Sequence, residues 1–271
     1  MPLLEHLKEL KTRVFRAAVF VLLGSLAGWF LWQGWTDSYW KVPAFRGGVF
    51  GLLQSPILEE AARRDMVVSI NFGEVGSAFD FAVKGALWIG VIVSSPFWLW
   101  QFWRFITPGL TKKERGYAVG FISAAVPLFF VGAFMAYLVL PNAVRFLIDF
   151  TPADASNVIS ASVYIQFCMQ IILAFGLGFL VPVVIVALNL AGVVSGKAVL
   201  KQWRLSVFIS FLFAAIATPT TDITTMFMLV APLLFLFFAA TVIALINDKR
   251  RARKSDEPDY AQLSDDEAST I

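Results

Sequence analysis

The chain has 271 residues, of which 58% are apolar and 15% charged, with 27 phenylalanines and a mean hydropathy of +0.74. A soluble domain of this length does not bury so much apolar surface, so the composition predicts an integral membrane protein. A single cysteine and a single histidine exclude an intrachain disulfide and a clustered Cys/His metal site, and a net charge of +3 gives no reason to expect nucleic-acid binding.

Six apolar segments are candidates for crossing a bilayer, which takes roughly 17 to 25 helical residues. We expect helices at about 14–35, 77–103, 116–140, 163–190, 205–217 and 224–246. The fifth is short because residues 218–222 are typical of a turn. The first is longer than the apolar core of a signal peptide and follows two acids, so it is expected to be retained. The predicted fold class is all-α and polytopic.

Lysine and arginine are concentrated at residues 8–16, 104–115, 197–204 and 249–254. The six predicted spans place all four segments on the same side of the bilayer. Cytoplasmic segments of membrane proteins carry such an excess, so both termini are expected in the cytoplasm. A six-helix transmembrane domain would then cover residues 1–248. Residues 249–271 turn from basic to acidic and are poor in apolar side chains, which predicts a disordered cytoplasmic tail.

Prolines lie inside four of the apolar segments, at Pro96, Pro127, Pro182 and Pro232. Each removes a backbone donor and tends to bend its helix. We therefore expect bent helices that form a concave bundle.

The helices carry little that could perform chemistry. The sequence has no phosphate-binding loop, no nucleophile elbow and no zinc-binding His-Glu-x-x-His pair, so we do not expect an enzyme or a cofactor. Asp80 and Lys84 are four residues apart and are expected to pair at one end of the second helix. Interfacial anchoring is the simple interpretation of that pair, and a functional role is the alternative.

Two carboxylates interrupt basic stretches, Glu9 within residues 6–13 and Glu114 within residues 111–115. The predicted topology places both on the cytoplasmic face. Glu9 could pair with Arg13 one helical turn later, and Glu114 could neutralise its basic neighbours. Alternatively, the two acids bind a cationic ligand. Sequence physics alone leaves both interpretations open.

Several separate motifs resemble one family. They are PLLEHLKEL at 2–10, SPFWLWQFWRF at 95–105, PGLTKKER at 108–115, AFG at 174–176 and VPV at 181–183. Their order and spacing are similar to those of the TatC family, the multispanning subunit of the twin-arginine protein translocase. The resemblance extends from residue 2 to about residue 247.

The resemblance implies a receptor in the cytoplasmic membrane of a prokaryote. TatC proteins bind the twin-arginine signal peptides of folded cargo at their cytoplasmic face and use the proton-motive force. The implied partners are single-span TatA-type and TatB-type subunits, signal peptides, membrane lipid and further copies of the chain in a receptor complex.

The resemblance also implies site residues. Glu9, Glu114 and Phe105 match the signal-binding residues, with Arg13 nearby and Lys11 standing where the family usually has arginine. Arginine pairs bidentately with carboxylates, so two acids suit two adjacent arginines.

Other positions relate to partners or to the opposite face. Pro56 matches a functional proline of the first outer loop, and the polar candidates for partner contacts are Thr218, Asp222, Gln166 and Gln170. Two positions depart from the family: Leu180 replaces a glutamate of many relatives, and Met226 replaces a glutamine. The polar surface for partner helices is therefore expected to be reduced or redistributed.

A small-solute secondary transporter is the alternative function. Such a transporter predicts internal repeats and convergent polar groups near the bilayer midplane. The sequence shows neither feature, which favours a receptor.

Overall fold

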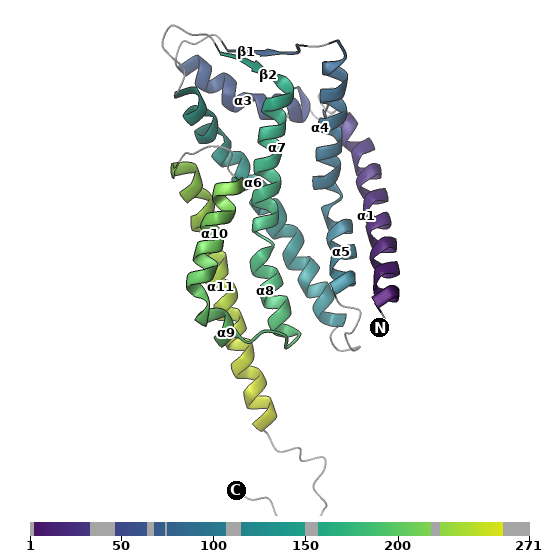
Figure 1. The fold of residues 1–271 in the computed structure, drawn as a ribbon, viewed down its shortest axis with the longest axis vertical. Coiled ribbons are helices and arrows are strands. Elements are labelled where there is room, and N and C mark those ends of the chain that lie inside the picture. Colours follow the sequence, from purple (N-terminus) through teal and green to yellow (C-terminus); the bar gives the residue numbers. More distant parts are fainter. Residues whose placement is uncertain are drawn as a thin grey trace, which may run out of the picture.

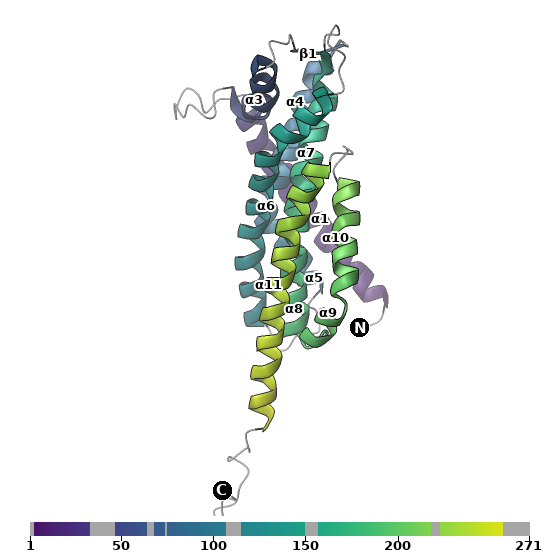
Figure 2. The same cartoon turned by 90° about the vertical axis from the view of Figure 1, so that its left-hand side faces the viewer.

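The computed structural model describes residues 3–32, 47–63, 68–73, 75–106, 115–149, 157–217 and 223–256. Its elements are α1 (Leu3–Trp32), α3 (Gly48–Arg63), β1 (Val68–Asn71), α4 (Ser77–Val93), α5 (Ser95–Ile106), α6 (Arg115–Asp149), β2 (Asn157–Ser160), α7 (Ala161–Gly178), α8 (Val181–Leu190), α9 (Gly196–Lys201), α10 (Trp203–Ala217) and α11 (Ile223–Asp256). The long helices run side by side (Figure 1). In Figure 2 the start of α1 and the helix α10 project to the same side of α6 and α11, while Figure 1 places them at opposite edges, so the bundle is curved.

Six apolar spans have counterparts in this fold. Four segments are long and apolar enough to cross a membrane, namely Glu5–Trp32, Gly120–Arg145, Ala161–Leu190 and Met226–Arg253. The helices α4 and α5 meet the same test together, although they are bent by 58°, and α10 is a shorter apolar helix. The all-α polytopic class is confirmed.

Three helices extend beyond the ranges expected from the sequence. Helix α1 begins at Leu3 rather than near residue 14, and α6 continues through Pro141 to Asp149 rather than ending near residue 140. Helix α11 continues to Asp256, so residues 249–256 are helical rather than part of a disordered tail. In each case the helix continues beyond the apolar segment from which it was predicted.

Two of the four prolines lie at helix breaks. Pro96 and Pro182 are each the second residue of a helix, after a break at Ser94 and at Phe179–Leu180. Proline is tolerated there because its missing N–H has no partner in the first turn. Pro127 and Pro232 lie within continuous helices, so proline alone did not determine the breaks.

The two ends of the bundle differ. At one end α1 begins, α5 ends and α9 lies, and we call this the basic end because its side chains include Lys8, Lys11, Arg104, Lys197 and Lys201 (Figure 1). At the opposite end lie α3 and the strands β1 and β2, and we call this the capped end.

The cap was not predicted from the sequence. Strands β1 and β2 pair in parallel, with Val68 opposite Asn157 and Asn71 opposite Ser160. Such short strands from segments far apart in the chain leave no local pattern. The carboxylate of Glu60 on α3 lies 3.9 Å from Nε of Arg145 on α6, which ties α3 to the helix that continues past Pro141.

Pro56 lies buried inside α3. Because proline has no N–H, the carbonyl of Leu52 loses its helical partner, and the hydroxyl of Ser55 donates to it at 2.9 Å. Ser55 Oγ also lies 3.4 Å from the hydroxyl of Tyr137 on α6. The proline is thus accommodated by a local hydroxyl that faces the neighbouring helix.

A buried hydrogen bond joins α7 to α3, from the hydroxyl of Tyr164 to the carbonyl oxygen of Leu53 at 2.7 Å. We expect Tyr164→Phe to lower stability by about 1 kcal/mol, because the change removes one buried hydrogen bond and no volume. The measurement is the thermal unfolding midpoint of the purified chain. Tyr137→Phe is the matched control and should change the midpoint less, since its contact is longer; an equal shift for both variants would contradict the prediction.

Helix α1 packs closely on α4 through small residues. Gly24 and Gly28 are one turn apart on α1, and Ala86 and Gly90 are one turn apart on α4. A Cβ added at Gly24 would lie 2.8 Å from the carbonyl oxygen of Gly90, and one added at Gly90 would lie 2.6 Å from the backbone nitrogen of Ser25. A Cβ at Gly28 would overlap the carbonyl oxygen of Ala86. Small residues spaced in this way allow close contact between helix backbones inside a membrane.

At the basic end, polar side chains join α8 to α11 in what we call the α8–α11 clasp. Asn189 is 1% exposed, and its Nδ2 donates to Asp248 Oδ1 at 2.8 Å and to the carbonyl of Val194 at 2.9 Å. Its Oδ1 accepts from Asn247 at 3.0 Å, and Asp248 Oδ2 accepts from the backbone N–H of Gly196 at 2.7 Å. Every side-chain polar atom of Asn189 therefore has a partner.

Candidate functional site

Glu9 and Arg13 form an ion pair on α1 near the basic end. Arg13 donates to Glu9 Oε1 through Nε at 3.0 Å and also through Nη2. The side chains of Arg13 and Glu9 are only 14% and 22% exposed, so the pair lies against the bundle rather than in solvent. The pairing expected from the four-residue spacing is confirmed, but it occupies only one of the two carboxylate oxygens.

The second carboxylate oxygen of Glu9 has no such contact in the ranges that the structure describes. Glu9 Oε2 is buried and has no hydrogen-bond partner within the described part of the chain. Leaving a buried carboxylate oxygen unpaired costs free energy, because its interaction with water is lost and not replaced. Glu9 therefore retains an open acceptor for a further cationic donor.

Phe105 contributes the facing surface from α5. Its ring stacks on His6 of α1 with ring centroids 4.5 Å apart and an interplanar angle of 22°. His6 precedes Glu9 by one turn, so the stack adjoins the Glu9–Arg13 pair. The structure thus brings together three of the predicted site residues, Glu9, Arg13 and Phe105, and uses His6 as a packing residue.

Two predicted residues are not part of this cluster as described. Lys11 is exposed and lies two residues after Glu9, which places it on a different face of α1. Glu114 lies outside the described residues.

The predicted partner residues are dispersed. Gln166 and Gln170 are both exposed and lie one turn apart on α7. Pro56 lies at the capped end, on the opposite end of the molecule from Glu9. Thr218 and Asp222 lie outside the residues that the structure describes.

Leu180 and Met226, the two positions expected to depart from the family, make apolar contacts. Leu180 is 8% exposed and packs in a cluster with Leu99 and Phe129, and Met226 packs partly buried against the other core cluster. A carboxylate in place of Leu180 would need a partner that this apolar cluster does not contain. The cluster around Leu180 therefore accommodates leucine at this position better than it would a glutamate.

Gln101 on α5 was not predicted. It is 8% exposed, and its Oε1 is buried without a hydrogen-bond partner in the ranges that the structure describes. The available signal was a lone amide within the aromatic stretch 95–105, four residues from both Phe97 and Phe105.

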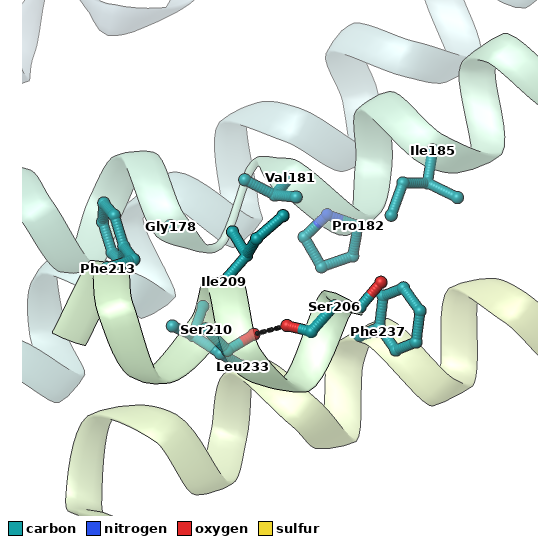
Figure 3. Close-up of a pocket in the computed structure, with 10 residues that line it drawn as sticks. All are labelled: Gly178, Val181, Pro182, Ile185, Ser206, Ile209, Ser210, Phe213, Leu233 and Phe237. Atoms are coloured by element: carbon teal, nitrogen blue, oxygen red, sulfur yellow. Dashed lines mark hydrogen bonds between the residues drawn. The ribbon is translucent and has the colours of Figure 1, made fainter. Parts of the chain in front are cut away.

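Two cavities lie away from this cluster. A cavity of about 300 Å³ between the α7–α8 junction, α10 and α11 is lined by apolar side chains and by Ser206 and Ser210 (Figure 3). The hydroxyl of Ser210 donates to the carbonyl of Ser206 at 2.8 Å, so it is already used within α10. The second cavity, about 540 Å³ at the capped end, contains the predicted Asp80–Lys84 pair, confirmed at 2.7 Å with both side chains 56% exposed. Neither cavity holds an unpaired buried acid.

The comparisons with known proteins agree with the resemblance. The family model described as Sec-independent protein translocase protein (TatC) matches residues 5–232. A protein of that description from Xylanimonas cellulosilytica is 40% identical over 255 residues, covering 94% of this chain and 87% of the relative. The relative from Rothia mucilaginosa is 37% identical, covering 94% and 82%.

A solved structure is also similar. The crystal structure of the twin arginine translocase receptor TatC superposes with a TM-score of 0.68 at 29% identity, covering 90% of this chain and 99% of that one. The similarity in fold and in sequence therefore extends over nearly the whole chain.

Proposed function

This chain belongs to the TatC family of Sec-independent protein translocase proteins, and we propose that it binds twin-arginine signal peptides at its basic end. It is a non-enzymatic, multi-pass membrane protein of a prokaryotic cell, and a receptor component of the twin-arginine translocation system. The concentration of lysine and arginine at the basic end supports a cytoplasmic orientation for it, by the positive-inside rule.

The observation that carries the proposal is the half-occupied carboxylate of Glu9. Its Oε1 accepts from Arg13, whereas its buried Oε2 has no partner among the described residues. A signal arginine would supply the missing donor. Glu114 would bind the second arginine, which gives one carboxylate for each guanidinium.

Arginine suits this site better than lysine. A guanidinium is planar, always charged and weakly hydrated, so it enters a partly buried site at lower desolvation cost than an ammonium group. Phe105 offers an aromatic surface beside Glu9, on which a guanidinium can stack. These properties would give the receptor its preference for an arginine pair.

The partners proposed for this receptor are TatA-type and TatB-type single-span subunits, together with further copies of the chain. Gln166 and Gln170 support this proposal, because exposed amides one turn apart on a spanning helix can hydrogen-bond to a partner helix in lipid. Transport itself would draw on the proton-motive force.

Peptide binding tests the proposed function. The purified chain in lipid nanodiscs should bind a fluorescent signal peptide with adjacent arginines at least about tenfold more tightly than the same peptide with two lysines, since one charge-assisted hydrogen bond is worth about 1.5 to 3 kcal/mol. Fluorescence anisotropy measures both affinities. The control is a peptide with two glutamines, which should bind more weakly than either. Equal affinity for the arginine and lysine peptides would contradict the proposal.

A further inference from the structure

Gln101 is an unusual residue to find buried within an aromatic helix such as α5. It is 8% exposed, yet its Oε1 has no hydrogen-bond partner in the described ranges. Buried side-chain acceptors are nearly always hydrogen-bonded, and an exception calls for an explanation such as an absent ligand. The neighbouring positions of α5 are aromatic, so nothing in the local sequence requires an amide here.

The contacts of α5 show which way this residue faces. Phe97 stacks on Phe20 of α1 at 4.8 Å between ring centroids, and Phe105 stacks on His6 of α1 at 4.5 Å. Gln101 lies four residues from each of these phenylalanines, and residues four apart share a helix face. Gln101 therefore lies on the face of α5 that packs against α1, between two aromatic contacts.

The facing surface of α1 carries the ion pair. Glu9 and Arg13 follow His6 by three and seven residues, and Phe20 follows it by fourteen. At about 100° of rotation per residue, these four residues fall within a stripe about 60° wide. Glu9, Arg13 and Gln101 thus share one interface, which we call the α1–α5 seam, closed at its basic end by the His6–Phe105 stack.

Among the described residues, the α1–α5 seam contains more buried hydrogen-bond acceptors than donors to pair with them. Glu9 Oε1 is occupied by Arg13, while Glu9 Oε2 and Gln101 Oε1 are both buried and unpartnered within the described residues. The seam therefore offers two open acceptors and a net need for donors. By contrast, each polar side-chain atom of the buried Asn189 in the α8–α11 clasp has a partner within the protein.

We propose that Gln101 is a specificity-determining residue of the signal-peptide site, accepting one N–H of a signal arginine while Glu9 Oε2 accepts another. This inference rests on the proposed function and deepens it. A guanidinium presents five N–H groups in a fixed plane and can serve two separate acceptors at once, which an ammonium group does with less geometric fit. Binding requires α1 and α5 to separate at the His6–Phe105 stack, because both oxygens are shielded in the unoccupied chain.

The test compares the nanodisc-embedded chain with Gln101→Met, which keeps the length of the side chain and removes its acceptor. We expect affinity for the twin-arginine peptide to fall about tenfold and affinity for the twin-lysine peptide to fall less, so that the ratio of the two affinities decreases. The matched control is Gln202→Met, an exposed glutamine at the same end of the bundle, which should leave both affinities unchanged.

Thermal stability separates recognition from folding. Removing an unpaired buried acceptor should not lower the unfolding midpoint, and a purely structural glutamine would do so. If Gln101→Met does not fold, Gln101→Leu provides the same loss of the acceptor in a different shape. An unchanged arginine-to-lysine ratio in a folded variant overturns the role of Gln101, whereas failure of the unmodified chain to prefer arginine overturns the proposed function instead.

Discussion

Replacing both Glu9 and Glu114 with alanine is expected to reduce export of a twin-arginine reporter to background in cells that rely on this chain. Each carboxylate would form a charge-assisted contact worth about 1.5 to 3 kcal/mol, so the double change weakens signal binding by about a hundredfold or more. The measurement is the fraction of reporter found outside the cytoplasm. Full export by the double variant at normal protein levels would contradict the binding assignment.

Two controls decide what Glu9 does. Glu59→Ala removes an exposed acid from α3 at the capped end and should leave export unchanged. The variant Glu9→Ala also leaves Arg13 without its ion-pair partner, so Glu9→Ala combined with Arg13→Ala tests whether that imbalance is the cause. If Glu9 serves only to neutralise Arg13, the combined variant restores export. If Glu9 binds the signal, export remains low.

Gly28→Leu is expected to prevent α1 from packing against α4 and to remove most of the folded protein from the membrane. A Cβ at this position already overlaps the backbone carbonyl of Ala86, and backbone cannot move aside as a side chain can. Overpacking of this kind usually costs about 1 to 3 kcal/mol and here affects the main contact of α1. Size-exclusion chromatography of a fluorescent fusion measures the folded fraction.

Gly120→Leu is the matched control for this prediction. Gly120 lies in α6, and a Cβ added there meets no atom within 4 Å. The control should keep the folded fraction, since replacing glycine in a helix lowers the entropy of the unfolded chain. Equal loss in both variants would show that leucine in place of any helical glycine is harmful and would refute the packing argument.

Sequence patterns predicted the spans but not the cap. A run of apolar residues near the thickness of the bilayer is a local signal, so six helices could be recognised one at a time. Strands β1 and β2 form their ladder only by pairing with a segment far away in the sequence, and four residues of sequence carry no record of a distant partner. The helix expected at 116–140 continues through Pro141 to Asp149, where the contact between Arg145 and Glu60 ties the extension to α3.

The candidate site, too, was predicted only in part. The spacing of Glu9 and Arg13 indicated their pairing, since residues four apart meet on any helix. The burial of Gln101 depends on how α1 and α5 align, and a single sequence does not contain that alignment. Lys11 was included because the resemblance places it where the family usually has arginine, but it lies on a different face of α1 from Glu9.

The α8–α11 clasp and the α1–α5 seam differ in how completely their buried polar atoms are paired. Asp248 and Asn189 join α11 to α8 and to the start of α9, with each of their polar side-chain atoms paired inside the protein. The contact between α8 and α11 therefore has its polar groups paired, whereas between α1 and α5 two acceptors, Glu9 Oε2 and Gln101 Oε1, have no partner among the described residues. A signal arginine bound between α1 and α5 would therefore complete that interface without breaking any hydrogen bond of the α8–α11 clasp.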